Sequence, residues 1–364
     1  MVKYLFILGR NLELSKAELF SYFEREGNKI LSDKLIGNGF LVESEREIPQ
    51  KIIETFGGVI SIGKVLCKAE NSELEKVNLY NGTKNNINFC IWEFGEVKEI
   101  RDYLKKRFGE ERLKASEKHM GSFIDMQGGE SVKNLGHKKT VDEEYFIFED
   151  YFGRITQRSD YEKIEKRDME KPFRRSDLAI SPRLAKIMIN LSQVKKGDKL
   201  LDPFCGIGVV LQESLLQGIK AVGVEIDKDA AEKAVKNLEW GRFNKKNYKI
   251  INGDSKKVGV EKVDVIVSEP DLGETLKKTT NEEKAKRIIN DYENLMINVL
   301  NNMKKITEGR IVFTAPLIMA HKKRIGCDKQ RILQKTGLKL AKGFPIPEYR
   351  EEQVVGREII VLNK

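Results

Sequence analysis

The sequence contains few cysteines and histidines, the residues that form disulfides and bind structural metals in small proteins. Among 364 residues there are 4 cysteines and 3 histidines, and no two cysteines form a C-x-x-C pair. This scatter excludes a disulfide framework and offers no zinc-ligand spacing, so reduced thiols and no metal are expected. No apolar run approaches the ~20 residues of a membrane span, and polar residues interrupt the first apolar stretch too early for a signal peptide. A cytoplasmic location is therefore expected.

Acidic residues are scarce in two parts of the chain. The net charge is +10, and residues 151–200 hold 13 Lys and Arg against 7 Asp and Glu, while 301–350 hold 12 against 3. The first 150 residues are nearly neutral, with 23 against 26. Clustered positive charge suits phosphate binding, although lysine-rich surfaces also serve solubility, so the charge alone leaves both interpretations open. The length exceeds that of a usual single core, which favours two domains.

One stretch, KLLDPFCGIGVVLQESLLQGIKAVGVEID at 199–227, has the pattern of a strand, a glycine loop, a helix and a second strand. Glu225 ends the second strand. Glycines let backbone approach a ligand where a Cβ would clash, and an acid at this place can accept both hydroxyls of a ribose. The glycines alone would also suit a turn that only packs a helix onto a sheet. The loop lacks the third glycine of the dinucleotide fingerprint and the Gly-Lys-Ser/Thr of a P-loop.

The sequence D-P-F-C-G-x-G followed by G-V-E-I-D closely resembles motifs I and II of class I S-adenosylmethionine-dependent methyltransferases. The resemblance is to the branch that modifies exocyclic amines of nucleic-acid bases, and it implies S-adenosyl-L-methionine as the cofactor. Glu225 would hold the ribose, with Asp227 as the less favoured acid. The cofactor-binding candidates in these motifs are Asp202, Pro203, Cys205, Gly206, Gly208, Glu225 and Ile226.

The start of the chain, Y-L-F-I-L-G-R-N-x-E-L-S-x-A-E-L, predicts a strand and then a helix opened by a Ser15-x-x-Glu18 capping box. It resembles the amino-terminal segment of archaeal and eukaryotic tRNA guanosine-10 N2-methyltransferases, although a small α+β unit would look similar. In that family residues 50–150 would hold a THUMP domain, which binds tRNA. A basic amphipathic helix is predicted there, over 97–108.

A charged stretch, QRSDYEKIEKRDMEKPFRR at 157–175, predicts a linker or a surface strap. Ser181-Pro182 then sets a helix start with proline in its first turn. R-D-x-x-K-P-F-R followed by S-P-R-L-A-x-x-x-I-N-L resembles the segment that leads into motif I in the same tRNA enzymes, where it helps to close the cofactor pocket. Ser181 and Pro182 are therefore cofactor-side candidates, with a plain helix cap as the alternative.

RNA contacts are expected as a group rather than one by one, because each cation alone could be a solvated side chain. The RNA-binding candidates are Lys105, Lys106, Arg107, Arg174 and Arg175. After the third strand of the core comes Asn-Gly-Asp-Ser at 252–255. In the family an acid here binds the adenine amino group, so Asp254 and the adjacent Ser255 are candidates, against an ordinary turn aspartate.

The fourth strand, over 263–267, leads into Ser-Glu-Pro-Asp-Leu-Gly. Amino-methyltransferases of this branch carry Asp/Asn-Pro-Pro-Tyr at this place. An exocyclic amine is a poor nucleophile because its lone pair is delocalised, so acceptors hold it in line with the methyl group while the tyrosine stacks on the base. By position, Glu269, Pro270 and Asp271 are the catalytic candidates, with Glu269 as the acceptor. Leu272 replaces the stacking ring.

Together these patterns predict an α+β RNA-binding region with a THUMP-like domain over 1–155, a charged linker over 156–178, and a Rossmann-like domain with a seven-stranded mixed sheet over 179–364. Helices are also predicted over 291–303 and, with basic character, over 321–335. The expected function is methylation of a base amine in RNA, guanine N2 in tRNA, by a monomer that has no membrane partner. Two alternatives stay open: a non-catalytic RNA-binding protein that keeps the fold, suggested by SEPDLG, and a DNA amino-methyltransferase.

Overall fold

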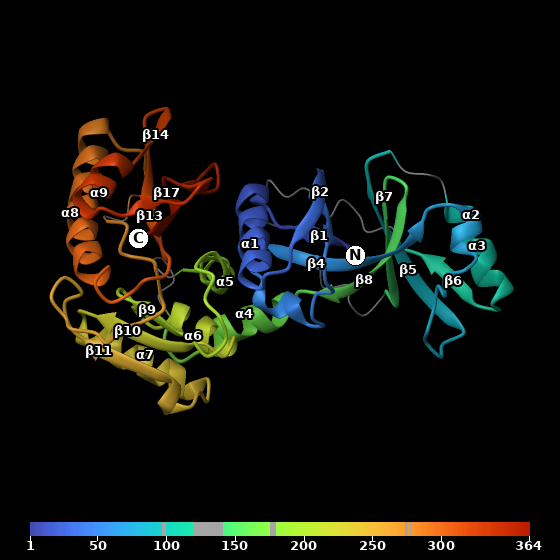
Figure 1. The fold of residues 1–364 in the computed structure, drawn as a ribbon, viewed down its shortest axis with the longest axis horizontal. Helices are drawn as coiled ribbons and strands as arrows, with labels where there is room; N and C mark the ends of the chain where they lie inside the picture. Colours follow the sequence, from blue (N-terminus) through green and yellow to red (C-terminus); the bar gives the residue numbers. More distant parts are fainter. Residues whose placement is uncertain (97–99, 119–140, 175–179, 274–275, 277) are drawn as a thin grey trace. The chain divides into compact units, whose positions relative to one another are not determined.

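A computed structural model describes residues 1–96, 100–118, 141–174, 180–273, 276 and 278–364, in two compact units (Figure 1). The first unit comprises Met1–Ser15, Gly27–Glu54 and Gly58–Tyr161, and the second comprises Lys16–Glu26, Thr55–Gly57 and Glu162–Lys364. Two short segments from the start of the chain therefore belong to the unit formed mainly by its carboxyl-terminal part.

The first unit is built on an eight-stranded sheet with the strand order β2-β3-β1-β4-β8-β7-β5-β6. Its strands are β1 (Val2–Leu8), β2 (Ile30–Ile36), β3 (Gly39–Ser44), β4 (Val59–Lys68), β5 (Asn86–Phe94), β6 (Lys114–Glu117), β7 (Glu143–Phe148) and β8 (Tyr151–Arg158). Two helices, α2 (Asn71–Leu74) and α3 (Arg101–Glu110), lie near its β5–β6 end (Figure 1). Leu104 and Phe108 of α3 are fully buried in one cluster with Phe89 and Tyr145 of the sheet. Their burial fixes which face of this basic helix is exposed.

The second unit contains a nine-stranded sheet whose main path runs β11-β10-β9-β12-β13-β17-β15. These strands are β9 (Lys199–Asp202), β10 (Lys220–Glu225), β11 (Tyr248–Asn252), β12 (Val265–Ser268), β13 (Ile311–Ala320), β15 (Lys339–Leu340) and β17 (Val355–Asn363). The pairs from β11 to β13 are parallel, and β17 runs antiparallel to both β13 and β15. The seven strands of this path confirm the Rossmann-like prediction. The structure adds β14 (Lys323–Gly326) beside β13 and β16 (Ile346–Glu348) beside β17.

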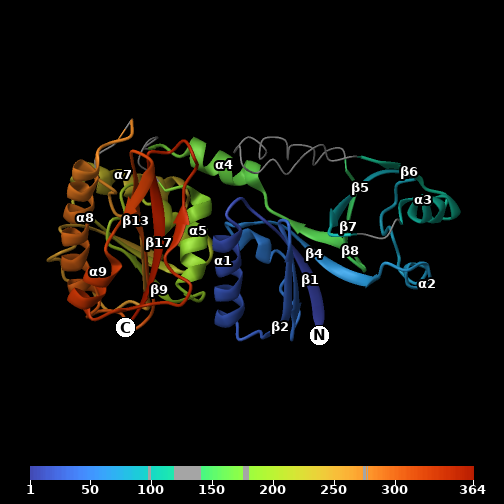
Figure 2. The ribbon, with the colours of Figure 1, turned by 90° about the horizontal axis from the view of Figure 1, so that it is seen from above.

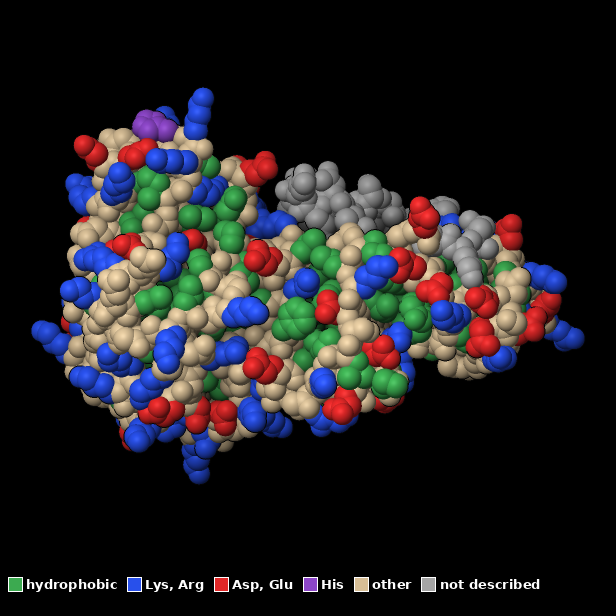
Figure 3. Space-filling view, turned by 45° about the horizontal axis from the view of Figure 1, so that its top comes forward, with side chains coloured by type: hydrophobic (Ala, Val, Ile, Leu, Met, Phe, Trp, Pro, Cys, Tyr) green, Lys and Arg blue, Asp and Glu red, His purple; other side chains and the backbone are tan. Residues whose placement is uncertain are grey.

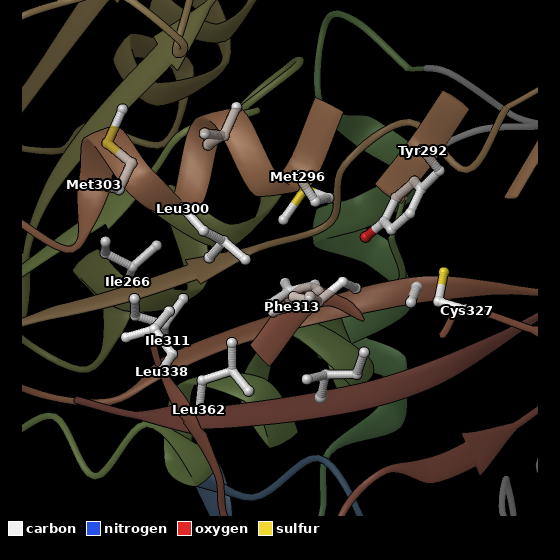
Figure 4. Close-up of a cluster of buried hydrophobic side chains, with 14 of the residues drawn as sticks. Ile266, Tyr292, Met296, Leu300, Met303, Ile311, Phe313, Cys327, Leu338 and Leu362 are labelled. Atoms are coloured by element: carbon white, nitrogen blue, oxygen red, sulfur yellow. The ribbon is translucent and has the colours of Figure 1, made fainter. Parts of the chain in front are cut away.

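Helices of the second unit lie beside its sheet (Figure 2). They are α5 (Pro182–Leu191), α6 (Val209–Leu216), α7 (Lys228–Trp240), α8 (Glu282–Met303) and α9 (Lys329–Thr336), whereas α4 (Tyr161–Glu170) contacts α6. On α8 the buried side chains recur at helical spacing and face the sheet, so that Met296 and Leu300 point toward Phe313 and Ile266 (Figure 4). This cluster is the largest part of the core beneath the candidate site.

The helix α1 (Leu12–Arg25) shows why part of the amino terminus joins the second unit. Glu18 on α1 is fully buried, and its Oε1 accepts hydrogen bonds from Gly57 N at 2.8 Å and from Asn190 Nδ2 at 2.8 Å. Arg25 donates to Asn190 Oδ1 at 3.1 Å. Asn190 is on α5, so three segments that are distant in sequence meet at one amide. The expected boundary at residue 155 leaves this contact out, because capping and periodicity describe a helix but not its partner.

One local prediction was incomplete, and another was wrong. The stretch 157–175 is not simply a connector, since it contains α4, and Arg167 on α4 binds the buried Glu213 of α6 through both oxygens, at 2.7 and 3.0 Å from Nη2. The predicted helix over 321–335 is instead the strand β14 followed by α9. His321, at φ +53°, lies in the turn that separates β13 from β14, and a left-handed residue ends any helical interpretation there.

We expect Glu18→Ala to destabilise the second unit by about 1 to 3 kcal/mol, because it leaves the buried Gly57 N without its acceptor and leaves Asn190 Nδ2 with Thr55 O as the one acceptor described for it. Chemical denaturation of the full chain measures the effect. Glu24→Ala on the same helix is the control; its side chain is 67% exposed, so its loss should stay below about 0.5 kcal/mol. Equal small losses in both variants would show that α1 does not stabilise this unit.

Candidate active site

The candidate site lies where three parallel strands of the second sheet end. The strands β9, β10 and β12 end at Asp202, Glu225 and Ser268, and Glu269 follows directly. The register pairs Gly223 with Asp202 and Ile266 with Leu201, so these ends meet at one edge. Ligands of open α/β sheets bind at such carboxyl edges. The three carboxylates are close enough that Glu225 and Glu269 both influence the ionisation of Asp202.

The glycine loop is held in place by the acid that ends β10. Gly206 N donates to Glu225 Oε2 at 2.8 Å, and Glu225 Oε1 accepts from Asp227 N at 2.9 Å. Gly206 has φ +49°, and a Cβ built on it would meet no atom within 4 Å. Gly208, at φ +88°, is the N-cap of α6. Left-handed backbone explains both glycines, and the empty space at Gly206 leaves its backbone accessible to a ligand.

Asp202 is buried, at 2% exposure, and receives two hydrogen bonds at Oδ1. The donors are Phe204 N, at 3.1 Å, and the hydroxyl of Ser268. Burial raises the pKa of Asp202 to about 7, and these two donors oppose that rise. The Ser268 bond ties the end of β12 to the end of β9. Ser268 stands directly before Glu269 in the sequence, where no pattern indicates this bond to Asp202.

Other predicted cofactor residues support the glycine loop through backbone hydrogen bonds or through packing. Cys205 N donates to Val224 O at 3.0 Å, and its buried thiol lies against Gly223. Burial raises the pKa of that thiol well above its ordinary value, so it stays protonated. Pro203 is buried, and its carbonyl oxygen accepts from the hydroxyl of Ser255. The loop is therefore braced from both β10 and the segment after β11.

Several remaining candidates have the structural roles that were given as alternatives to cofactor binding, namely helix caps and a turn aspartate. Ser181 is the N-cap of α5, accepting from Leu184 N at 3.2 Å, and Pro182 is buried in the first turn. Asp227 caps α7 by accepting from Asp229 N at 2.9 Å, which favours Glu225 as the ribose acid. Asp254 accepts from Lys256 N at 3.0 Å, as a turn aspartate does. Its half-buried side chain lies in the segment that also holds Ser255.

The two acids of the SEPDLG motif have different surroundings. The side chain of Glu269 is 7% exposed, and its Oε1 binds Nε of Arg357, on β17. Burial raises the pKa of Glu269, and Arg357 opposes that rise. Asp271 is exposed and accepts from Gly273 N at 3.0 Å within its own turn. Pro270 is buried, and Leu272 packs against the core, so this motif presents no aromatic ring.

The sequence analysis missed Asn237, which links two parts of the site. It is buried on α7 and donates to Ile207 O at 3.0 Å and to Phe173 O at 3.1 Å, while accepting from Phe173 N at 3.0 Å. One amide thereby fixes the glycine loop to the segment before α5. In the sequence, Asn237 is an asparagine among the alanines and leucine of α7, and nothing in that pattern indicates its partners.

The predicted RNA-binding cations on α3 already have partners. Lys105 lies 3.6 Å from Glu117, Lys106 lies 3.8 Å from Glu110, and Arg107 donates to Leu74 O at 3.0 Å. Arg174 is exposed, and Arg175 lies outside the described residues. On the face seen in Figure 3, lysine and arginine side chains are interspersed with acidic ones rather than gathered in one patch.

In the described ranges, no group of three or more His, Cys, Asp or Glu side chains could hold a metal ion. Among the helices of those same ranges, none is both long enough and apolar enough to cross a membrane.

The loop and its surroundings fit an adenosine-containing cofactor. The open space at Gly206 is one that a Cβ would enter, and Glu225 presents a half-buried carboxylate beside it. Ile226, immediately after this acid, leaves 69% of its side chain exposed. A ribose acceptor, a close backbone approach and an uncovered apolar side chain are therefore next to one another, as a nucleoside requires.

Asp202 predicts a measurable dependence of stability on pH. Its folded-state pKa, about 7, lies above its ordinary value of 3.8, so folding favours the protonated form and the stability it contributes falls as the pH rises through that window. Between pH 5 and pH 8 the wild type should lose about 2 to 3 kcal/mol more than Asp202→Asn. Urea unfolding of both proteins measures this. Equal losses would mean that Asp202 is ionised throughout.

Parts of the chain match two families of known methyltransferases. Residues 172–331 match the RMKL-like methyltransferase domain, and residues 68–236 match a DNA methylase family. The first match contains the loop, Glu225 and Glu269. The second ends within α7, before β12, and so does not include the SEPDLG motif.

Three archaeal relatives are tRNA (guanine(10)-N2)-dimethyltransferases. That of Methanothermobacter thermautotrophicus is 37% identical over 115 residues, which is 31% of this chain and 33% of the relative. That of Methanocaldococcus jannaschii is 41% identical over 110 residues, 28% and 31% of the two chains. That of Pyrococcus abyssi is 30% identical over 209 residues, 56% and 58%. The matches thus span about a third to under two thirds of these relatives.

Among solved structures, TrmN from Thermus thermophilus aligns with 100% of this chain and 99% of its own, with a TM-score of 0.50 and 14% identity. At that identity the likeness concerns the fold, which is that of class I methyltransferases. By these matches the chain is similar to tRNA (guanine(10)-N2)-dimethyltransferases over the part that the matches cover, and by the order of its strands its second unit has the Rossmann-like fold of class I methyltransferases.

Proposed function

We propose that this protein is a cytoplasmic, monomeric enzyme that transfers a methyl group from S-adenosyl-L-methionine to an exocyclic amine of tRNA, guanine N2. The observation that carries the proposal is the meeting of Glu225, the Gly206 loop and Glu269 at one edge of the second sheet. The names of the archaeal relatives support tRNA and guanine as the substrate.

The cofactor supplies an electrophilic methyl group on a positively charged sulfur. Glu225 would accept the ribose hydroxyls, the backbone around Gly206 would approach the ligand, and Ile226 would be covered by its apolar surface. Asp202, Pro203, Cys205, Gly208 and Ser255 would support these contacts by fixing the loop, and Asp254 would reach the adenine. Because each support is a hydrogen bond made without a ligand, the loop is preorganised for binding.

Glu225→Ala should weaken binding of S-adenosyl-L-methionine by about 1 to 3 kcal/mol, roughly 5- to 150-fold in Kd, because it removes a charged acceptor and also the bond that anchors Gly206 N. Isothermal titration calorimetry measures the change. Asp227→Ala is the control: it removes the N-cap of α7, so it should cost about 1 kcal/mol of stability and leave the affinity unchanged. Similar affinities for wild type and Glu225→Ala would contradict the assignment.

The residues after β12 would hold the target amine. Glu269 would accept a hydrogen bond from the amine, and the carbonyl oxygen of Pro270 would accept the other, which aligns the nitrogen with the methyl group. Asp271 is less suited to this role because it is exposed and occupied by Gly273 N. The stacking contact of the family motif is absent, since Leu272 packs into the core instead.

Glu269→Ala should slow single-turnover methylation of unmodified tRNA by about 100-fold or more through lost positioning, while Asp271→Ala should slow it much less. Mass spectrometry of the tRNA nucleosides identifies the product, and calorimetry checks that both variants still bind the cofactor. An unaffected Glu269→Ala, or an equal loss at Asp271, would reverse the two roles.

The first unit is proposed to hold the tRNA through a THUMP-like domain within residues 50–150. The support is its separate sheet, with α2 and α3 packed near one end, together with the relatives' substrate. Because Lys105, Lys106 and Arg107 already have partners in the described structure, RNA contact there would have to exchange those partners for phosphates. Arg174 needs no such exchange in the bonds that are described.

A non-catalytic tRNA-binding protein is the second candidate, and one observation favours it: one oxygen of Glu269 is already bound to Arg357. The two candidates differ in a single experiment. Wild-type protein that binds S-adenosyl-L-methionine and tRNA but methylates no unmodified tRNA would be non-catalytic. A third candidate, methylation of DNA, rests on the match over 68–236 and is tested by replacing the tRNA with duplex DNA in the same assay.

A further inference from the structure

Glu269 and Arg357 form a pair that spans three strands of the second sheet. Glu269 follows β12, Arg357 lies on β17, and β13 runs between these strands. In the register, Arg357 is opposite Pro316 of β13 on one side and Glu348 of β16 on the other. Because β17 is antiparallel to β13, its first residues lie at the same carboxyl edge as the end of β12.

The two oxygens of Glu269 are not equivalent. Oε1 accepts from Nε of Arg357, whereas Oε2 is buried and has no hydrogen-bond partner among the described residues. A buried acceptor without a donor is costly unless a ligand supplies one. The side chain of Glu269 is 7% exposed, while that of Arg357 is 23% exposed. One oxygen is therefore fixed to the protein, and the other is buried without a donor among the described residues.

The departure of this motif from the family makes the pairing useful. Glu269 stands where the family carries Asp or Asn, and its side chain is one methylene longer, so it has an additional rotatable bond. Bidentate-capable guanidinium groups hold carboxylates in defined orientations. A fixed Oε1 removes the added freedom of the longer side chain and sets the direction of Oε2.

We propose that Arg357 is a positioning residue that keeps Glu269 ionised and directs its Oε2 at the target amine as a hydrogen-bond acceptor. The proposal rests on the proposed function. Ionisation matters because a protonated carboxyl can turn a donor toward the amine hydrogens, whereas a carboxylate only accepts. The titratable groups that bear on this pair are Asp202 on β9, the neutral phenol of Tyr292 on α8 and Glu348 on β16.

The first test uses the amide in place of the carboxylate. A guanidinium only donates, so Arg357 would bind the amide oxygen of Glu269→Gln and turn its NH₂ toward the amine, donor against donor. We expect Glu269→Gln to lose roughly as much single-turnover rate as Glu269→Ala, about 100-fold. In Arg357→Met/Glu269→Gln the amide is free to turn, so the rate should recover by about tenfold or more.

The second test is the pH profile of kcat/KM. Without the guanidinium, the buried carboxyl of Glu269 keeps its proton to higher pH. Arg357→Met should therefore shift the acidic limb of the pH profile to higher pH, by about one pH unit or more, and the activity of this variant should recover at alkaline pH. Arg357→Lys keeps a positive charge and should lie between the two. Arg357→Met is also compared with its parent in an Asp202→Asn background. A shift that persists there cannot come from ionisation of Asp202. A merely structural loss would be independent of pH.

A third readout does not depend on turnover. Relative to wild type, Arg357→Met should lower Tm more at pH 8 than at pH 5, because an unpaired buried carboxylate is then ionised against its environment. Arg357→Met/Glu269→Gln, which carries no charge at either position, should lose that pH dependence and stays testable if the single variant folds poorly.

Three results would overturn the proposal in an active wild type: a Glu269→Gln rate that Arg357→Met does not raise, a loss in Arg357→Met that is the same at every pH, or a faster Arg357→Met enzyme. The last result would mean that the pair holds Glu269 away from the substrate. Failure of the proposed function is distinct, because the wild type itself would then methylate no tRNA, and the positioning role would fall with it.

Discussion

The hydrogen bond from Gly206 N to Glu225 Oε2 is the contact on which the rest of the candidate site depends. It closes the loop after β9 onto the end of β10, and only a glycine at φ +49° lets the backbone present that N–H without a side chain in the ligand space. Because β9, β10 and β12 are parallel, their carboxyl ends lie at one edge of the sheet. A bond between the loop after β9 and the end of β10 therefore also fixes the backbone that faces the end of β12. Cys205, Ser255 and Asn237 reinforce the loop through further hydrogen bonds.

Several carboxyl groups lie at the same edge, and burying them in ionised form costs desolvation free energy. Desolvation raises the pKa of Asp202 and of Glu269, and the chain opposes it differently at each: with hydrogen-bond donors at Asp202 and with a guanidinium at Glu269. A neutral donor only moderates the rise, whereas a cation directly favours the charged form. The two acids can therefore differ in protonation although they lie at neighbouring strand ends. Such divergence is typical of sites that combine binding with chemistry.

The second unit is not a continuous piece of sequence. Residues Lys16–Glu26 and Thr55–Gly57 belong to it, and Glu18 places a fully buried carboxylate against Asn190. A fragment that starts after the first unit would leave Asn190 without two of its partners, Glu18 and Arg25. Removing the proposed RNA-binding region would therefore disturb the methyltransferase domain, and the two effects must be separated by substitutions rather than by truncation.

The sequence alone determined those parts of the protein that depend on neighbouring residues. The order of strand, glycine loop, helix, strand and acid over 199–227 is local, since Glu225 lies 19 residues from Gly206. Periodicity, capping and glycine chemistry were enough to predict that unit and the place of Glu269 at a strand end, whereas the seven-stranded mixed sheet was expected from the resemblance to class I methyltransferases. The same reasoning failed over 321–335, where a basic helix was predicted and the turn at His321 was not.

Only the tertiary structure decided the partners. Ser268 meets Asp202 across 66 residues, Arg357 meets Glu269 across 88, and Asn190 meets Glu18 across 172. Periodicity and spacing report which face a side chain occupies, but they carry no information about which distant strand or helix will present the complementary group. That information arises when strand order is set, because the packing of the sheet brings particular side chains to the same edge. The candidate residues of the site were readable in the chain, whereas their protonation and orientation were not.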